Sequence, residues 1–244
     1  MKQADIDKLR SRKVSPQAHL IHGKQVSSQD ERQLDVISPI DGKSFTKIAA
    51  GSAADMNAAI ASARKTFDSG IWSDMEPKTR KAILLKWAEL VETEALDLAV
   101  MGVRDNGTEI GMAYKAEPGS AAGTIRFYAE SIDKIYGEVA PTAPNRLGLI
   151  HKTPIGVIGV IVPWNFPMMI GAWKLAPALA AGNTVVLKPA EVASLTLLRL
   201  AQLALEAGMP PGVFNVVTGK GSVVGETLAL SMDVDVLVFT GSGA

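Results

Sequence analysis

The chain has 244 residues, of which 47% are hydrophobic and 20% are charged, and its 25 Lys and Arg residues balance 25 Asp and Glu residues. A chain of this length can bury a large core in one or two domains, and a net charge of zero argues against nucleic acid or an anionic membrane as a partner held by bulk electrostatics. The sequence contains no cysteine, which excludes disulfides, thiolate metal ligands and cysteine nucleophiles within these residues, and we identify no metal site.

The N-terminal segment is polar, with a short helix expected over residues 4–10 and little other periodic signal. It has no apolar core of signal-peptide length, and no uninterrupted apolar run of membrane-span length follows, so we expect a cytoplasmic protein with no membrane partner. A strand beginning at Val36 ends in the Asp41-Gly42 turn, and residues 44–49 are expected to pair with it as a hairpin.

Three helical segments follow the hairpin. The first begins after Ser52, whose hydroxyl can cap it, and carries apolar residues at helical spacing until Gly70 ends it. A long amphipathic helix is predicted from Pro77 to about Val103, ended by Asp105-Asn106-Gly107, and a third helix over about residues 121–136. These helices offer packing faces, and we assign no chemistry to them.

Residues 137–155 differ in character, because Pro141 and Pro144 interrupt the chain and residues 147–153 alternate weakly, as an exposed or edge strand does. Two interpretations stay open. The segment is a surface hairpin, or it projects as an oligomer contact, since unpaired strand edges invite pairing.

The remaining sequence alternates regularly between strands and helices. Each strand is a short, continuous apolar run, as expected where both faces of a sheet are covered. The predicted strands are residues 157–162, 184–187, 213–217 and 234–239, and the predicted helices lie near residues 168–181, 194–207 and 222–230. We therefore predict an α/β fold, with a Rossmann-like, four-stranded parallel sheet and flanking helices.

Asn165 follows the first of these strands, between Pro163 and Pro167. The two prolines restrict the backbone, so the amide would be held in place, which suits a donor aimed at a developing oxyanion. The alternative is that Asn165 only caps the next helix, because Asn is a leading cap residue.

Lys188 and Glu191 stand where the second strand ends. A doubly wound fold places an acidic residue there, which hydrogen-bonds the adenosine ribose of a dinucleotide. A carboxylate accepts bonds from a diol and repels a 2′-phosphate, which favours NAD over NADP. The alternative is a solvated turn pair.

The glycine pattern adds a weaker signal. The G-x-G-x-x-G fingerprint is absent from the first turn, but glycines cluster at 219, 221 and 225 after the third strand. Such a turn allows close approach of the backbone to a ligand. Gly241 and Ser242 follow the last strand in a small-residue turn that could present amides to a phosphate.

Together these motifs resemble the NAD(P)-dependent aldehyde dehydrogenase superfamily, in order and in spacing, from Ser38 onward. The motifs are Pro163-Trp164-Asn165-Phe166-Pro167, residues 173–179 with Gly182-Asn183, Lys188-Pro189-Ala190-Glu191, residues 211–215, and Phe239-Thr240-Gly241-Ser242. General similarity leans toward enzymes for amino aldehydes from polyamine breakdown, including the γ-glutamyl-γ-aminobutyraldehyde type.

The resemblance implies a role for each motif. Asn165 would be the side-chain donor of the oxyanion hole, and Lys188 and Glu191 would bind the adenosine ribose of NAD. The cleft for the cofactor would be lined by Ile161, Val162, Pro163 and Trp164, with Gly221 and Gly225 near the adenine and Gly241 and Ser242 at the pyrophosphate. Residues 147–153 would belong to the projecting element through which such enzymes form dimers or tetramers.

The resemblance also implies what these residues lack. In the family a cysteine thiolate attacks the aldehyde, hydride passes to the nicotinamide, and a glutamate activates water to release the acid. Both groups lie beyond the Phe-Thr-Gly-Ser motif, so the chain resembles an amino-terminal half without the catalytic domain, and we expect it to be inactive alone. The alternative is a non-catalytic short paralogue that binds nucleotide or a partner subunit.

The resemblance implies that the chain has three regions. Residues 1–136 would form a helical part that packs on the cofactor domain, residues 137–155 the oligomerisation strand region, and residues 156–244 an incomplete NAD-binding core.

Overall fold

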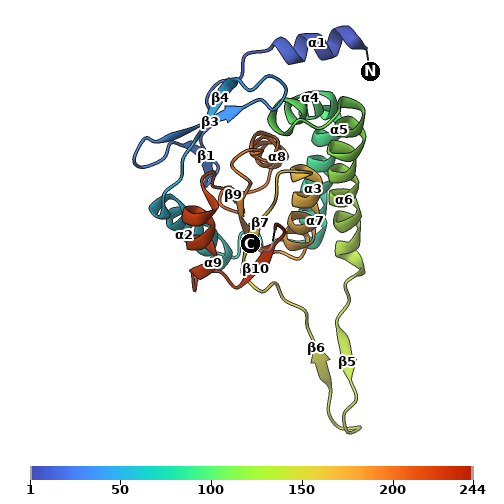
Figure 1. Ribbon diagram of the computed structural model, residues 1–244. Coiled ribbons are helices and arrows are strands. Elements are labelled where there is room, and N and C mark those ends of the chain that lie inside the picture. Colours follow the sequence, from blue (N-terminus) through green and yellow to red (C-terminus); the bar gives the residue numbers. More distant parts are fainter. Residues whose placement is uncertain (1, 243–244) are drawn as a thin grey trace.

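The computed structural model describes residues 2–242 and has a mixed α/β architecture built on one central sheet (Figure 1). The six strands lie in the order β10-β7-β8-β9-β1-β2. Four of them are parallel: β7 (Val157–Ile161), β8 (Thr184–Lys188), β9 (Phe214–Val216) and β10 (Val236–Phe239). The helices that join them are α7 (Pro167–Ala180), α8 (Leu195–Glu206) and α9 (Glu226–Leu230), the last preceded by a π-turn, η2 (Gly221–Gly225). The predicted parallel α/β sheet is confirmed.

The prediction of four strands was incomplete, because the N-terminal segment adds two more. Strand β1 (His19–Ile21) pairs antiparallel with β9 through Leu20 and Val216, and β2 (Lys24–Val26) pairs with β1. Each strand has three residues, too few to show an alternating pattern in the sequence. Their position is set by long-range pairing with β9.

Helices cover both faces of the sheet. On one face lie α2 (Ala53–Asp68) and α9, and on the other lie α7 and α8, backed by α3 (Pro77–Thr93) and α6 (Pro118–Ser131) (Figure 1). Alternate residues of β8 pack into the hydrophobic cores on opposite faces of the sheet. Val185 and Leu187 pack toward α7 and α8, and Val186 packs toward α2. A strand buried on both sides reads as a continuous apolar run, as the sequence showed.

The long helix predicted from Pro77 to Val103 is two helices, α3 and α4 (Ala95–Asn106). Between them Glu94 leaves the helical conformation, with φ −93° and ψ 12°. Its carboxylate pairs with Arg199 on α8, the Arg199 Nε donating at 2.8 Å. The helical sequence pattern alone would continue through this position, but the packing of α4 against α8 interrupts the helix.

Several local predictions hold. Ser52 and Asp55 form a reciprocal capping box at the start of α2, and Gly107 ends α4 in the left-handed region at φ 80°. The N-terminal helix α1 (Gln3–Ser11) and the hairpin of β3 (Gln33–Ile37) with β4 (Ser44–Ala49) are also present. The helix predicted over 121–136 is α6 followed by a 3-10 turn, η1 (Ile132–Lys134), and α5 (Ile110–Ala116) was not predicted.

The segment from 137 to 155 forms a two-stranded antiparallel hairpin, β5 (Glu138–Ala140) with β6 (Gly148–Ile150). It extends away from the body of the protein (Figure 1), and its apolar side chains Val139 and Leu149 are exposed. In the described part of the chain, no helix has both the length and the apolar character needed to cross a bilayer.

Candidate active site

The predicted site residues gather where the parallel strands end. Ile161 is level with Lys188 across β7 and β8, and with Phe239 across β7 and β10. Backbone hydrogen bonding between neighbouring segments continues past these ends. The Val162 N–H donates to the Lys188 carbonyl at 3.3 Å, and the Thr240 N–H donates to the Ile161 carbonyl at 3.1 Å. Carboxyl ends of neighbouring parallel strands are where open α/β sheets bind ligands.

Lys188 and Glu191 form an ion pair just past β8, with Lys188 Nζ at 3.0 Å from Glu191 Oε2. The Lys188 side chain is 5% exposed, whereas the Glu191 side chain is 40% exposed. The interpretation as a solvated turn therefore applies to Glu191 and not to Lys188. The ammonium is covered, and the carboxylate remains accessible to a hydrogen-bonding ligand.

The glycine turn η2 packs directly against this pair and against the end of β7. A Cβ added at Gly221 would lie 3.7 Å from Lys188 Nζ, and one added at Gly225 would lie 3.9 Å from the Ile161 Cδ1. Both are distances of ordinary van der Waals contact, so the η2 backbone lies close to both strand ends. The structure thus brings together four residues that lie far apart in the sequence.

Trp164 and Asn165 occupy the turn between β7 and α7. Val162 is buried and Pro163 partly so, while Trp164 is 58% exposed and Asn165 is exposed. The N-cap of α7 is Phe166, with no side-chain cap hydrogen bond. The alternative that Asn165 caps this helix is therefore wrong, and its amide makes no hydrogen bond to the described residues.

Gly241 and Ser242 follow β10 and are exposed. They stand at the same end of the sheet as Ile161, beyond the β10 strand that pairs with β7. A Cβ at Gly241 would lie 2.5 Å from the Phe239 ring, so this turn folds back over the last residue of β10.

Two buried carboxyls that the sequence interpretation missed hold the helices beside the site. Glu117 Oε2 accepts from the Met169 N–H in the first turn of α7 at 2.8 Å, and Asp105 Oδ2 accepts from the Leu195 N–H at the start of α8 at 2.8 Å. Burial raises the pKa of each carboxyl to about 7. The only sequence signal for either carboxyl is an acidic residue near an apolar stretch. In the sequence, Asp105 stands in the stop that ends the predicted helix.

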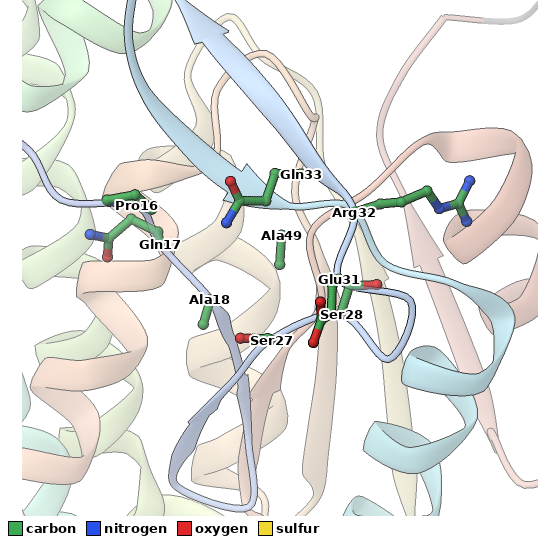
Figure 2. Close-up of a pocket in the computed structure, with 9 residues that line it drawn as sticks. All are labelled: Pro16, Gln17, Ala18, Ser27, Ser28, Glu31, Arg32, Gln33 and Ala49. Carbon is green, nitrogen blue, oxygen red and sulfur yellow. The ribbon is translucent and has the colours of Figure 1, made fainter.

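A separate cavity of about 430 Å³ lies between β1, β3 and the end of β4 (Figure 2). It is lined by Pro16, Gln17, Ala18, Ser27, Ser28, Glu31, Arg32, Gln33 and Ala49. The Arg32 side chain extends away from the other lining residues. None of the predicted site residues lines this cavity.

Comparison with known proteins gives a consistent result. The model of the "Aldehyde dehydrogenase family" matches residues 25–244. The NADP/NAD-dependent aldehyde dehydrogenase PuuC of Escherichia coli is 45% identical over 222 residues, covering 91% of this chain and 45% of PuuC. The aminoacetaldehyde dehydrogenase of Pseudomonas aeruginosa is 44% identical over 94% of this chain and 46% of that protein. The chain therefore spans about half the length of the curated relatives it matches.

Solved structures agree in fold. The indole-3-acetaldehyde dehydrogenase AldA of P. syringae, in complex with NAD+ and IAA, superimposes with a TM-score of 0.96 at 44% identity, over 99% of this chain and 49% of that one. The γ-glutamyl-γ-aminobutyraldehyde dehydrogenase of Burkholderia cenocepacia gives 0.94 at 44% identity, over 97% and 48%. With a family match over most of its length and this agreement in fold, the chain belongs to the aldehyde dehydrogenase family.

Proposed function

We propose that this chain is the cofactor-binding part of an NAD-dependent aldehyde dehydrogenase, which oxidises an aldehyde to a carboxylic acid. The observation that carries the proposal is the convergence of Ile161, Lys188, Gly221 and Gly225 at the carboxyl ends of parallel strands. The close glycine backbone beside the Lys188–Glu191 pair fits a nucleotide, because it leaves room where a side chain would stand.

In this proposal Lys188 and Glu191 bind the adenosine ribose, and Gly241 and Ser242 approach the pyrophosphate. Ile161, Val162, Pro163 and Trp164 line the remainder of the cofactor cleft. When bound, NAD supplies the acceptor for the hydride that leaves the substrate. The partly exposed Glu191 carboxylate accepts hydrogen bonds from ribose hydroxyls and repels a 2′-phosphate, so NAD is the preferred cofactor.

Asn165 is proposed to donate its side-chain amide to the oxygen on which negative charge develops. The exposed amide, free of a capping bond, is available for this role. A thiolate nucleophile and a general base are also needed, and since the chain has no cysteine the nucleophile must come from other residues. The isolated chain is therefore expected not to oxidise propanal with NAD.

The β5–β6 hairpin is proposed as the oligomerisation element, and residues 1–136, 137–155 and 156–244 are proposed as the three structural units of the chain. The exposed apolar side chains of the hairpin, Val139, Leu147 and Leu149, support an interface between subunits in a dimer or tetramer. The substrate is proposed to be an amino aldehyde, supported by the similarity to the γ-glutamyl-γ-aminobutyraldehyde and aminoacetaldehyde enzymes.

Calorimetric titration of the chain with NAD and with NADP tests the cofactor proposal. NAD should bind. Glu191→Gln should weaken the binding of NAD and narrow the preference for NAD over NADP by about tenfold, which corresponds to the loss of one charge-assisted hydrogen bond. Glu206→Gln, an acid on α8 that pairs with Arg199, is the matched control and should leave both affinities unchanged. Binding of neither nucleotide, or equal loss in both variants, would reject the assignment.

The absence of cysteine also supports a second candidate, a non-catalytic paralogue that binds nucleotide or a partner subunit. Sequencing the gene past codon 244 separates the two, because the enzyme proposal expects a downstream Cys and Glu in frame. NAD-dependent turnover by the chain alone that is abolished in Asn165→Ala would contradict both candidates.

A further inference from the structure

Asn106 is the last residue of α4, immediately before the left-handed Gly107. Its carboxamide reaches from the end of α4 to the turn that precedes α7. The Asn106 Nδ2 lies 3.3 Å from the Trp164 carbonyl oxygen and 3.4 Å from the Asn165 carbonyl oxygen. One side chain therefore contacts two consecutive carbonyls of the turn between β7 and α7, which carries the proposed oxyanion donor Asn165.

The orientation of this carboxamide is determined by a third hydrogen bond. The Thr108 N–H donates to Asn106 Oδ1 at 3.0 Å. An amide carries two N–H donors and one carbonyl acceptor, so the observed orientation satisfies all three partners. A flipped amide would set its oxygen against two carbonyls and its NH₂ against an N–H.

Asn106 is the donor to both carbonyls, and the backbone around them offers none. Pro163 and Pro167 have no N–H, and the Met169 N–H, which would otherwise reach back toward Asn165, donates to Glu117. The first backbone bond at this end of α7 runs from the Ile170 N–H to the Phe166 carbonyl at 2.9 Å. Among residues 2–242, no backbone N–H reaches either carbonyl.

We propose that Asn106 is a positioning residue that fixes the backbone of Asn165. The Trp164 and Asn165 carbonyls belong to the peptide groups on either side of the Asn165 Cα. Peptide groups are planar, so holding both carbonyls restrains φ and ψ of Asn165 together and fixes the direction in which its side chain leaves the chain. The inference rests on the proposed function only where it concerns catalysis; the restraint itself is a property of this fold.

Hydrogen–deuterium exchange of the chain tests the restraint directly. Asn106→Asp keeps the acceptor for Thr108 and removes the donor, and Asn106→Ala removes the donor without adding charge. In both variants the amides of Met169 and Ile170, which donate to Glu117 and to the Phe166 carbonyl beside the turn, should exchange about tenfold faster. The helices α3 and α8 should keep their protection. Asn57→Asp makes the same change at an exposed position on α2 and should leave the exchange of Met169 and Ile170 unaltered.

Unchanged exchange at Met169 and Ile170 in both Asn106 variants would overturn the proposal. Faster exchange throughout the chain would also overturn it, because Asn106 would then serve general stability. The thermal midpoint of each variant, measured alongside, separates these outcomes.

A kinetic cycle tests the consequence for catalysis, in a polypeptide that contains this chain together with the cysteine and the glutamate that the proposed function requires. Asn106→Ala should lower kcat by about tenfold, less than the full loss of an oxyanion donor, with an unchanged KM for NAD. In an Asn165→Ala background the same substitution should have no further effect, because Asn106 acts through Asn165. Additive effects would overturn the catalytic role. If the polypeptide with the cysteine and the glutamate oxidises no aldehyde while the exchange difference is present, the proposed function is rejected and the restraint on Asn165 stands.

Discussion

Replacement of Glu117 by Gln should make the stability of the protein less dependent on pH. The Glu117 carboxyl is buried and accepts the Met169 N–H at the start of α7. Glutamine keeps a carbonyl oxygen for this bond and removes the titrating group. The variant therefore isolates the free energy of burying one ionisable group.

The magnitude follows from the shift in pKa. Burial raises the pKa of Glu117 from 4.5 to about 7 in the folded protein, and one pKa unit corresponds to about 1.4 kcal/mol. Between these pH values the folded state holds a proton that the unfolded state has lost, so stability falls as pH rises through this window. The full cost is reached above pH 7 and is on the order of 3 kcal/mol, the net effect of burial and of the backbone N–H groups of Met168 and Met169 that donate to the carboxylate.

Urea denaturation at several pH values between 4 and 8 measures the effect. The free energy of unfolding of Glu117→Gln, minus that of the wild type, should be smallest near pH 4 and should grow until about pH 8. Glu109→Gln is the matched control of opposite sign. Backbone hydrogen bonds from Gly111 and Met112 lower the pKa of Glu109, so this variant should lose relative stability as pH rises. A constant difference between Glu117→Gln and wild type across the range would refute the reasoning.

Three further predictions concern packing, capping and the sheet edge. Trp87→Ala should lower the free energy of unfolding by about 4 kcal/mol in urea, because the buried indole also donates to the Leu200 carbonyl at 2.9 Å; a loss below about 1 kcal/mol would contradict it. Ser52→Ala should cost about 1 kcal/mol in the same assay through loss of the α2 capping box. The wild-type chain should self-associate through the β10 edge, where Leu237 is 40% and Phe239 57% exposed, and Phe239→Lys should reduce this in sedimentation velocity; a monodisperse wild-type monomer would count against it.

Patterns confined to a few residues predicted much of this fold. The Ser52–Asp55 capping box needs only one helical turn, and the four parallel strands are short apolar runs between helical segments. Local patterns also marked the strand ends, which is why Lys188, Glu191 and the glycine turn could be picked out before their proximity was known.

Features that depend on distant partners were not predictable in this way. The break at Glu94 follows from its pairing with Arg199, and the pairing of Leu20 with Val216 gives β1 its place in the sheet. Asn106 looks like the end of a helix until the Trp164 carbonyl, 58 positions away, is brought beside it. Such roles belong to the tertiary structure.

The order of strands in the sheet has a consequence for how the protein is made. Strand β7 lies between β8 and β10, and β1 pairs with β9, so both flanks of the sheet are completed by contacts between distant parts of the chain. During synthesis the β1–β2 hairpin leaves the ribosome long before β9 exists, and one edge of β7 stays open until β10 emerges. Contacts of such long sequence separation slow folding and expose strand edges meanwhile. The nascent chain therefore passes through a long interval in which strand edges are open to chaperones, and for β7 this interval lasts until β10 has emerged.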